Sequence, residues 1–232
     1  MNITHQTKQH IMMVRTLIFS LGLMLSCNVF AKGGPKATQS ALEEAVTDLQ
    51  SQIDDILMSP TYEIGDEVGG GIVFYVNEVA RYVLIAARYD QSMAITWYHN
   101  DLSIFTGATV DGLGAGKMNT AIIVSAQTND NQMGDFAAKL AANYSVQEDG
   151  VTACTGFASD TCYGDWYLPS KYELNLLYEE KDVVGLFADA NYWSSSENNR
   201  WSAWFQYFGD GVQGPNLKDN TFRVRAIRAF NF

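Results

Sequence analysis

The chain has 232 residues, of which 15 are Lys or Arg and 26 are Asp or Glu, so that its formal net charge is −11. Hydrophobic residues make up 47% of the chain, which is enough for one sizeable core and excludes disordered, collagen-like and multi-pass membrane proteins. The acidic balance also excludes a general nucleic-acid binder, because phosphate backbones are bound by clustered Lys and Arg.

Residues 1–31 have the segment order of a secretory signal peptide. Lys8 and Arg15 carry the positive charge, an apolar run follows, and Ala31 ends a suitable cleavage site. We expect cleavage after Ala31, and hence a secreted or cell-surface protein. A membrane anchor is one alternative, although the apolar stretch of 15 residues is shorter than the roughly 18 needed to span a bilayer. Lipoprotein processing at Cys27 is another, although the residues before it fit a lipobox poorly.

Residues 32–40 are predicted to form a polar linker, and residues 41–59 a short coiled coil. The apolar residues of the second segment are spaced alternately by four and three positions, as in a heptad repeat: Leu42, Val46, Leu49, Ile53 and Ile56. Because the repeat covers only about two and a half heptads, assembly needs support from the following domain. Leucine at d with a β-branched residue at a favours dimers in parallel coiled coils, whereas Ile at both positions, as at Ile53 and Ile56, shifts the preference toward trimers. The alternative is a helix packed on its own domain.

Residues 61–232 show no break in composition and are predicted to form one domain. Two apolar runs joined by a short polar loop, residues 69–76 and 81–87, predict a buried hairpin. Apolar residues at helical spacing predict helices over residues 117–127 and 137–144. The N-terminal third of the domain is therefore a hairpin and the middle is helical.

A third helix is predicted to begin after Ser170, because Ser170 and Glu173 have the spacing of a capping box. Aromatic and polar runs near the C-terminus, separated by turn residues, predict strands over residues 192–197, 201–208 and 221–230. The whole domain is therefore expected to be α+β, with strands concentrated in its last third.

Two cysteines, Cys154 and Cys162, remain after removal of the signal peptide. In an exported protein such a pair typically forms a disulfide, and the loop between them, CTGFASDTC, has nine residues. The chain-entropy model gives this bridge a stabilising contribution of about 2.5 kcal/mol. A redox pair is the alternative, but the spacing is not Cys-x-x-Cys.

The segments GDEVGGGIVFYV, TGATVDGLGAGKMNTAIIV, YGDWYLPSKYELNLLY, YWSSSE and VRAIRAF follow one another along residues 62–232. In this order they resemble the C-terminal domain family of Lcl, the Legionella collagen-like adhesin. The resemblance implies a bacterial surface or secreted module, related in fold to C-type lectins and formylglycine-generating enzymes, that trimerises and binds sulfated polysaccharides. The collagen-like repeats of that adhesin are absent from this chain, so a long stalk is not expected.

The glycine-rich stretch before the first predicted helix is similar to a phosphate-binding loop. That motif needs Gly five residues before the Gly116-Lys117 pair and Ser or Thr after it, whereas this chain has Asp111 and Met118 there. The spacing of a dinucleotide-binding motif is also lacking. We therefore interpret these glycines as turn residues that lead into a helix.

Catalysis and metal binding find little support in the sequence. His99 is the one His of residues 32–232, and no nucleophile elbow accompanies it, so we expect a loop His and no enzyme activity. A zinc site would lack ligands. An EF-hand loop starting at Asp130 would have Gln132 at its third position and Ala141 in place of the closing Glu. No catalytic residue, metal or cofactor is predicted.

The C-terminal run FRVRAIRAF carries most of the informative positive charge. In an alternating strand Arg223 and Arg225 lie on the face opposite the apolar residues, and Lys218 is close in sequence, so these three are candidate sulfate-binding residues. The alternative is a solvated strand face with ion pairs. Arg228 falls on the apolar face unless a bulge intervenes, and we expect it to be buried and paired with Glu173 or Asp165.

Aromatic residues are the second class of candidate glycan-binding residues, because flat aromatic rings stack on sugar faces. Trp201 lies beside polar residues and is expected to be exposed, so Trp201 and Arg200 are added to the candidate ligand-binding residues. The other aromatic residues considered are assigned to the core or to packing: Trp166, Tyr167, Trp193 and Trp204.

The expected fold is therefore a single C-type-lectin-like or formylglycine-generating-enzyme-like α+β domain, preceded by a short coiled-coil helix. The favoured function is an exported adhesin-like module, assembled as a homotrimer, that binds sulfated polysaccharide. A structural or protein-binding module of the cell envelope, with a cell-surface protein as its partner, is the alternative, and the acidic charge favours it because it repels sulfated chains. An enzyme on a lectin-like scaffold is supported only by fold analogy.

Overall fold

The computed structural model describes residues 36–58, 61–77, 79, 81–99, 104–128, 134–157 and 159–232. The chain divides into two units, Met1–Thr61 and Tyr62–Phe232. The expected signal peptide, residues 1–31, lies outside the described residues.

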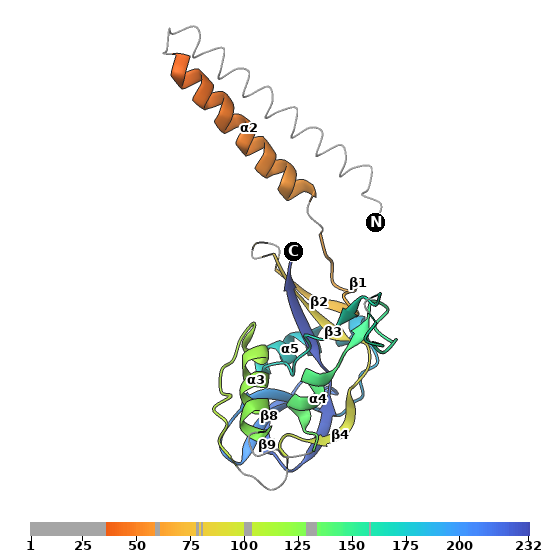
Figure 1. Cartoon of the computed structure of the whole chain (residues 1–232). Helices are drawn as coiled ribbons and strands as arrows, with labels where there is room; N and C mark the ends of the chain where they lie inside the picture. The colour runs from red at the N-terminus through yellow and green to blue at the C-terminus, as the bar shows by residue number, and fades with distance from the viewer. Residues whose placement is uncertain are drawn as a thin grey trace. The chain divides into compact units, whose positions relative to one another are not determined.

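One helix, α2 (Lys36–Met58), is described in the first unit (Figure 1). The helix expected over residues 41–59 is thus present, but it begins at Lys36, inside the segment that we expected to be a linker. Residues 36–40 contain neither Gly nor Pro, so nothing interrupts a helix there, whereas Gly-Gly-Pro directly precedes them. The linker prediction for residues 36–40 was wrong for this reason.

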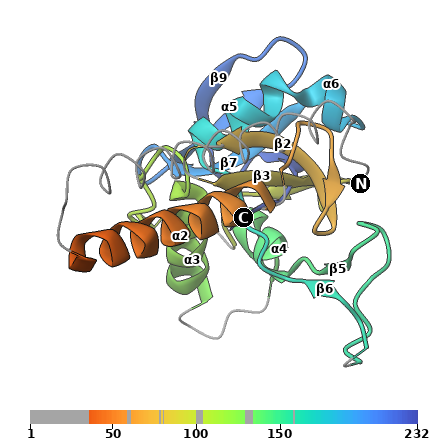
Figure 2. The same ribbon diagram turned by 90° about the horizontal axis from the view of Figure 1, so that it is seen from above.

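The second unit contains a four-stranded antiparallel sheet with the order β1-β2-β3-β11. Its strands are β1 (Glu67–Val68), β2 (Gly71–Asn77), β3 (Tyr82–Ala87) and β11 (Ile227–Asn231). Strands β2 and β3 lie side by side (Figure 2). The predicted hairpin is confirmed, since β2 pairs with β3 from Gly71 opposite Ala87 to Asn77 opposite Tyr82. Residues 83–87 are all buried, so β3 is the central strand of this half of the core.

A second sheet has five strands in the order β4-β10-β7-β8-β9. These are β4 (Ser92–Thr96), β7 (Asn191–Glu197), β8 (Ser202–Tyr207), β9 (Gln213–Leu217) and β10 (Thr221–Val224). All neighbours are antiparallel except β10 and β7. Strand β9, which the sequence did not suggest, contains Pro215 and lies at the edge of the sheet, where a missing N–H is tolerated.

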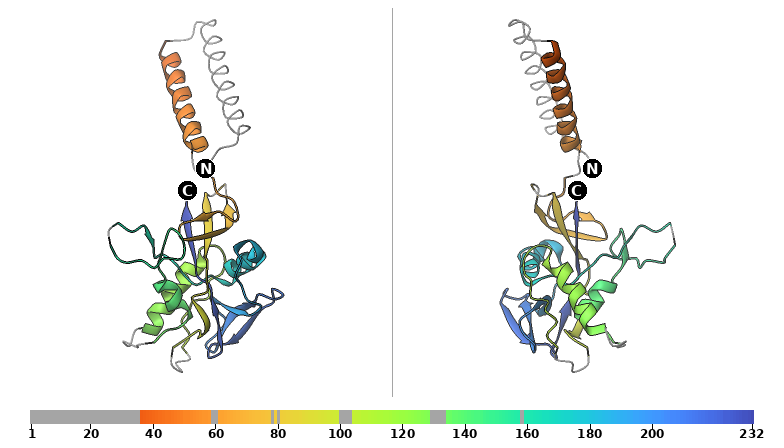
Figure 3. Two further views of the ribbon diagram at one scale, coloured as in Figure 1. Left: turned by 90° about the vertical axis from the view of Figure 1, so that its right-hand side faces the viewer. Right: turned by 60° about the vertical axis from the view of Figure 1, so that its left-hand side comes forward.

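Four helices and a short two-stranded ladder complete the described part of the second unit. They are α3 (Ala115–Thr128), α4 (Ala137–Asn143), α5 (Lys171–Glu179), α6 (Lys181–Val184), β5 (Val146–Gln147) and β6 (Cys162–Tyr163). The three predicted helices are confirmed, and Ser170 caps α5 through the predicted reciprocal capping box with Glu173. Part of the chain between β5 and β6 projects from the rest of the unit (Figure 3). The fold is thus mixed α+β and rich in strands.

The single strand expected over residues 221–230 is in fact two strands that belong to different sheets. The chain leaves β10 at Val224 and enters β11 at Ile227. The connection from β3 to β4 crosses between the same sheets, and the two crossings are joined by the hydrogen bonds Ala87 N to Ala226 O (2.9 Å) and Gln91 N to Val224 O (2.8 Å). The alternation of side chains over residues 221–230 did not reveal that the chain changes sheets, because the same alternation is compatible with one strand or with two.

Candidate functional site

The five predicted ligand-binding residues lie near opposite ends of the β4–β10 pair. Thr221 of β10 lies opposite Thr96, and Val224 lies opposite Ser92. Lys218 is close to the Thr221 end, together with Arg200 and Trp201, whereas Arg223 and Arg225 are at or beyond the Val224 end. The structure therefore brings these residues together as two separate groups.

Arg223 and Arg225 are bound to the same carboxylate and do not form the expected open sulfate site. Asp90 accepts a hydrogen bond from Arg225 Nε at 2.7 Å and from Arg223 Nη1 at 2.9 Å. The Arg225 side chain is fully buried, and its other N–H groups donate to carbonyl oxygens, including those of Ala87 (3.0 Å) and Leu186 (2.8 Å). The assignment of Arg225 to a solvated face was wrong. Arg225 lies where the chain passes from β10 to β11, and a guanidinium buried there must be neutralised inside the protein.

Lys218 is buried as well, which overturns its predicted contact with a sulfated ligand. Its ammonium group forms an ion pair with Glu197 and donates to the carbonyl oxygens of Ile104 and Arg200, each at 3.1 Å. It also lies 4.5 Å from the centre of the Trp97 ring. Burial lowers the pKa of Lys218. All of these partners are internal, so Lys218 holds the structure together and is closed to a ligand.

The other member of the pair, Glu197, fixes a loop that the sequence did not single out. Its carboxylate accepts hydrogen bonds from Thr106 N (3.0 Å), Thr106 Oγ1 (3.0 Å) and Gly107 N (2.8 Å). The chain directly after Phe105 is thereby anchored to the end of β7, and Lys218 holds the chain directly before it through the Ile104 carbonyl. The position of Phe105 is thus set by a buried charged group rather than by its own packing.

Three large hydrophobic side chains are exposed around this buried pair. Phe105 is 60% exposed, Trp201 is 58% exposed and Leu217 is 54% exposed. Their backbones converge on Lys218, which donates to the carbonyls of Ile104 and Arg200 through its side chain and to the Trp201 carbonyl through its N–H, at 3.0 Å. We call Phe105, Arg200, Trp201 and Leu217 the Trp201 surface.

The backbone under Trp201 is held in a fixed turn. Asn199 Oδ1 accepts hydrogen bonds from the N–H groups of Trp201 (2.8 Å) and Ser202 (3.0 Å). The Arg200 guanidinium lies 5.3 Å from the centre of the Trp201 ring, within cation–π range. The exposure predicted for Trp201 is confirmed. Phe105 and Leu217 were missed, and their only sequence signal is an apolar residue in an otherwise polar loop or turn.

The glycine-rich stretch binds an anion, but the anion is the protein's own Glu173. The buried Glu173 carboxylate accepts hydrogen bonds from Gly114 N (2.8 Å), Gly116 N (3.1 Å) and Ser170 N (2.9 Å), and from Tyr167 Oη (3.1 Å). Burial raises the pKa of Glu173. The interpretation of these glycines as a turn before a helix is confirmed, because α3 begins at Ala115.

Arg228 is buried and paired, as expected, with one of the two proposed acids. Its Nε lies 2.7 Å from Asp165 Oδ1, and its Nη1 donates to the Gly69 carbonyl at 2.9 Å. The Asp165 alternative is therefore confirmed and the Glu173 alternative was wrong, since Glu173 faces the glycine-rich stretch. Trp166, Tyr167 and Trp193 are buried, as expected, and Trp204 is half-buried.

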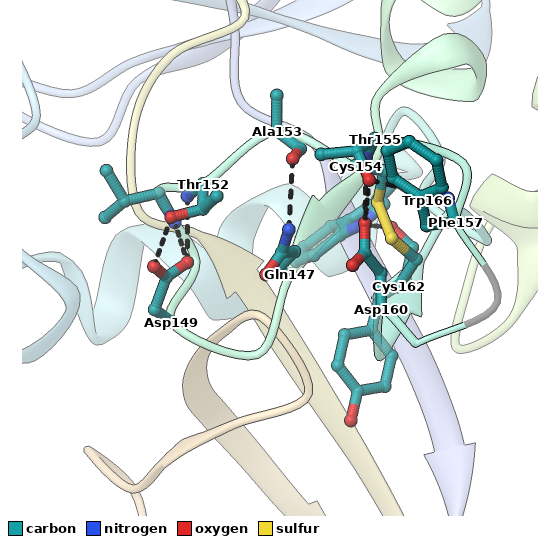
Figure 4. Close-up of a disulfide and its surroundings, with 12 residues drawn as sticks. Gln147, Asp149, Thr152, Ala153, Cys154, Thr155, Phe157, Asp160, Cys162 and Trp166 are labelled. Carbon is teal, nitrogen blue, oxygen red and sulfur yellow. Dashed lines mark hydrogen bonds between the residues drawn. A yellow bond between two sulfur atoms is a disulfide. The ribbon is translucent and has the colours of Figure 1, made fainter.

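Cys154 and Cys162 form a disulfide in the projecting segment, with Cα atoms 5.9 Å apart (Figure 4). One carboxylate fixes the turn before the bridge, and another fixes the loop that the bridge closes. Asp149 accepts hydrogen bonds from Val151 N (2.9 Å) and Thr152 N (2.8 Å), and Asp160 accepts from Thr155 N (3.1 Å). The pKa of Asp149 is lowered to about 2, chiefly by the hydrogen bond from the Thr152 hydroxyl and then by those from the N–H groups of Thr152 and Val151.

His99 lies half-buried three residues after the end of β4, and its backbone N–H donates to Gln127 Oε1 at 2.9 Å. Within the described ranges, no three His, Cys, Asp or Glu side chains come close enough to hold a metal ion. The first four residues of the stretch similar to an EF-hand, 130–133, lie outside the described residues, and its last position, Ala141, lies in α4. In the part of the chain that the structure describes, each helix is too short or too polar to cross a membrane.

Comparison with protein-family models and with curated proteins found no match for this sequence.

Proposed function

We propose that this protein is an exported, adhesin-like module of the bacterial cell surface whose globular unit binds polysaccharide at the Trp201 surface. One observation carries the proposal: exposed Trp201, Phe105 and Leu217 lie on backbone that the buried Lys218–Glu197 pair holds in place. Exposed large apolar groups on a rigid frame are typical of binding sites. A tryptophan ring and a phenylalanine ring supply flat faces on which sugar rings stack.

The charge around this surface favours stacking over recognition of sulfate. The positive charge of Lys218 is balanced internally by Glu197, and those of Arg223 and Arg225 lie against Asp90. Arg200 is the exposed cation of the Trp201 surface. Binding to a sulfated chain through one cation would show only a shallow salt dependence, since each phosphate-like contact contributes about one counterion to the slope.

The resemblance to the Lcl C-terminal domain family supports a C-type-lectin-like, non-catalytic domain and a homotrimer. The heptad spacing within α2 supports the same assembly, and Leu49, one of its core positions, is 55% exposed. Deletion of residues 42–58 should convert the trimer to a monomer in light scattering. A trimer that persists after this deletion would mean that the globular unit sets the assembly.

The proposal is tested by binding of the purified protein to immobilised neutral and sulfated glycans at several salt concentrations. We expect binding that is lost in a Trp201→Ala, Phe105→Ala double variant and retained in Phe157→Ala, which removes an even more exposed aromatic ring from the disulfide loop. Binding that survives the double variant would remove the Trp201 surface from the proposal.

The second candidate is a structural or protein-binding module of the cell envelope. The net charge of −11 favours it, because acidic surfaces repel sulfated chains at long range. The same glycan panel separates the two candidates. Absence of binding to every glycan, with the protein folded, would favour the envelope module and a protein partner for the exposed hydrophobic residues.

A further inference from the structure

A depression of about 400 Å³ lies where the chain passes from β3 to β4. Three segments form its walls: residues 89–91, the end of α4 with Asn143 and Tyr144, and the turn at Gly150 and Val151. Its volume is within the range of roughly 300–1,000 Å³ found for small-molecule sites. We call it the Tyr89 pocket. It lies at the start of β4, whereas the Trp201 surface lies past its end.

The floor of the pocket is held in place by internal hydrogen bonds. Asp90 is held by Arg225 and Arg223, and it also accepts a hydrogen bond from the Tyr192 hydroxyl at 3.0 Å. The Gln91 amide donates to the Tyr89 carbonyl at 2.8 Å and accepts from Ala226 N at 2.5 Å. Because Asp90 is already bound by Arg223, Arg225 and Tyr192, its carboxylate is not available to a positively charged ligand.

The rim is also formed in advance. The Asp149 carboxylate fixes the turn through Val151 N and Thr152 N. Gly150 has φ +69°, and a Cβ there would lie 2.8 Å from the Gly70 carbonyl oxygen, so the turn packs closely on the sheet and only Gly fits. A ligand would therefore meet a preorganised site and would lose little free energy in ordering it.

The pocket offers apolar faces together with unused hydrogen-bonding groups. Tyr89 is 52% exposed and Val151 is also exposed. Among the described residues, neither the Asn143 amide nor the Tyr144 hydroxyl has a hydrogen-bond partner. The Tyr144 ring is fixed by edge-on packing against Trp166 at 5.2 Å, and burial raises the pKa of Tyr144, so its hydroxyl remains a donor at neutral pH.

We propose that the Tyr89 pocket binds one uncharged pyranose residue, with an apolar sugar face on Tyr89 and sugar hydroxyls bonded to Asn143 and Tyr144. A molecule with one apolar face and several hydroxyl groups matches both properties of the pocket, and the occupied Asp90 carboxylate leaves no partner there for a positively charged sugar. This site is independent of the Trp201 surface, since each is built from different segments.

Saturation-transfer NMR on the full chain tests the proposal, with the methyl pyranosides of glucose, galactose, mannose and N-acetylglucosamine as probes. We expect at least one of them to bind. Its Kd should rise about tenfold in Tyr89→Ala and in Asn143→Ala, on the scale of one lost stacking or hydrogen-bonding contact. Trp201→Ala should leave it unchanged, as should Tyr172→Ala, which removes an exposed tyrosine from α5.

Two outcomes would overturn the proposal that the Tyr89 pocket binds a sugar. One is the absence of saturation transfer to all four probes, and the other is binding that Tyr89→Ala and Asn143→Ala both leave unchanged. If Trp201→Ala abolishes that binding instead, the sugar lies on the Trp201 surface, so the pocket fails while the proposed polysaccharide function gains support. Near-ultraviolet circular dichroism of each variant confirms that the fold is retained.

Discussion

Glu197 and Lys218 form an ion pair from which solvent is excluded, with side chains that are 0% and 1% exposed. The pair joins the end of β7 to the residue after β9 and to the loop around Phe105. Removing two charges from water is costly, and here their mutual attraction and the surrounding carbonyl and N–H groups offset that cost. The pair acts as the internal support of the Trp201 surface.

Lys218→Met should lower the free energy of unfolding by about 3–5 kcal/mol, because it leaves the Glu197 charge buried without its partner. The double variant Lys218→Met, Glu197→Gln should recover most of this loss, since neither charge remains and the amide oxygen can still accept from the loop at Thr106 and Gly107. Urea unfolding followed by circular dichroism measures both values.

The matched control is Glu67→Gln, which breaks the Arg88–Glu67 pair, where the Glu67 side chain is 65% exposed. An exposed pair contributes little to stability, so this change should have a small effect. If Lys218→Met is no more destabilising than Glu67→Gln, the buried pair is not a structural support.

Local patterns predicted the elements whose signals lie within one segment. The hairpin over residues 69–87 and the cap at Ser170 follow from neighbouring residues, and both are present. The Arg223 and Arg225 assignments failed because their shared partner Asp90 is 133 and 135 residues away in sequence. The assignment of Lys218 failed because no local feature of the sequence shows that Glu197, 21 residues earlier, enters the core beside it. Alternation gives the face of a strand, but not whether that face is covered.

Gly116→Ala should destabilise the protein, although alanine is the better helix former by about 1 kcal/mol. A Cβ at this position would lie 2.3 Å from Glu173 Oε2, 2.6 Å from Ser170 N and 2.8 Å from the Leu168 carbonyl oxygen. Because two of these three atoms are backbone, the site cannot relax easily, and we expect a loss of about 1–3 kcal/mol in urea unfolding.

Gly164→Ala is the matched control for this change, since the nearest atom to its Cβ would be Ser145 Cβ at 3.7 Å, an ordinary contact. Equal stability of Gly116→Ala and the unchanged protein would contradict the close packing of Glu173 against the start of α3.

Glu173 should make stability depend on pH. Burial raises its pKa above the ordinary value of 4.5, although the N–H groups of Ser170 and Gly114 offset part of the shift. The folded protein therefore binds this proton more tightly than the unfolded chain. The stabilising contribution is complete below pH 4.5 and is lost as the pH rises through the folded pKa.

Glu173→Gln removes this titration. Relative to the unchanged protein, the variant should be least stable under acidic conditions, and the difference in the free energy of unfolding should narrow as the pH rises toward neutrality. Urea unfolding at a series of pH values measures it, with Glu179→Gln on the same helix as the control. A difference that does not vary with pH would show that the pKa of Glu173 is not raised.

The disulfide between Cys154 and Cys162 should protect the projecting segment. Because the bridge lies within that segment, its loss should favour local opening of the β5–β6 ladder rather than unfolding of the core. A contribution of about 2.5 kcal/mol corresponds to roughly sixtyfold faster amide exchange in the ladder of the Cys154→Ser, Cys162→Ser variant. The buried amides of β3 serve as an internal control and should keep their rates. Faster exchange in β3 by the same factor would mean that the bridge stabilises the whole unit, and unchanged exchange in the ladder would mean that the turns fixed by Asp149 and Asp160 hold the segment without it.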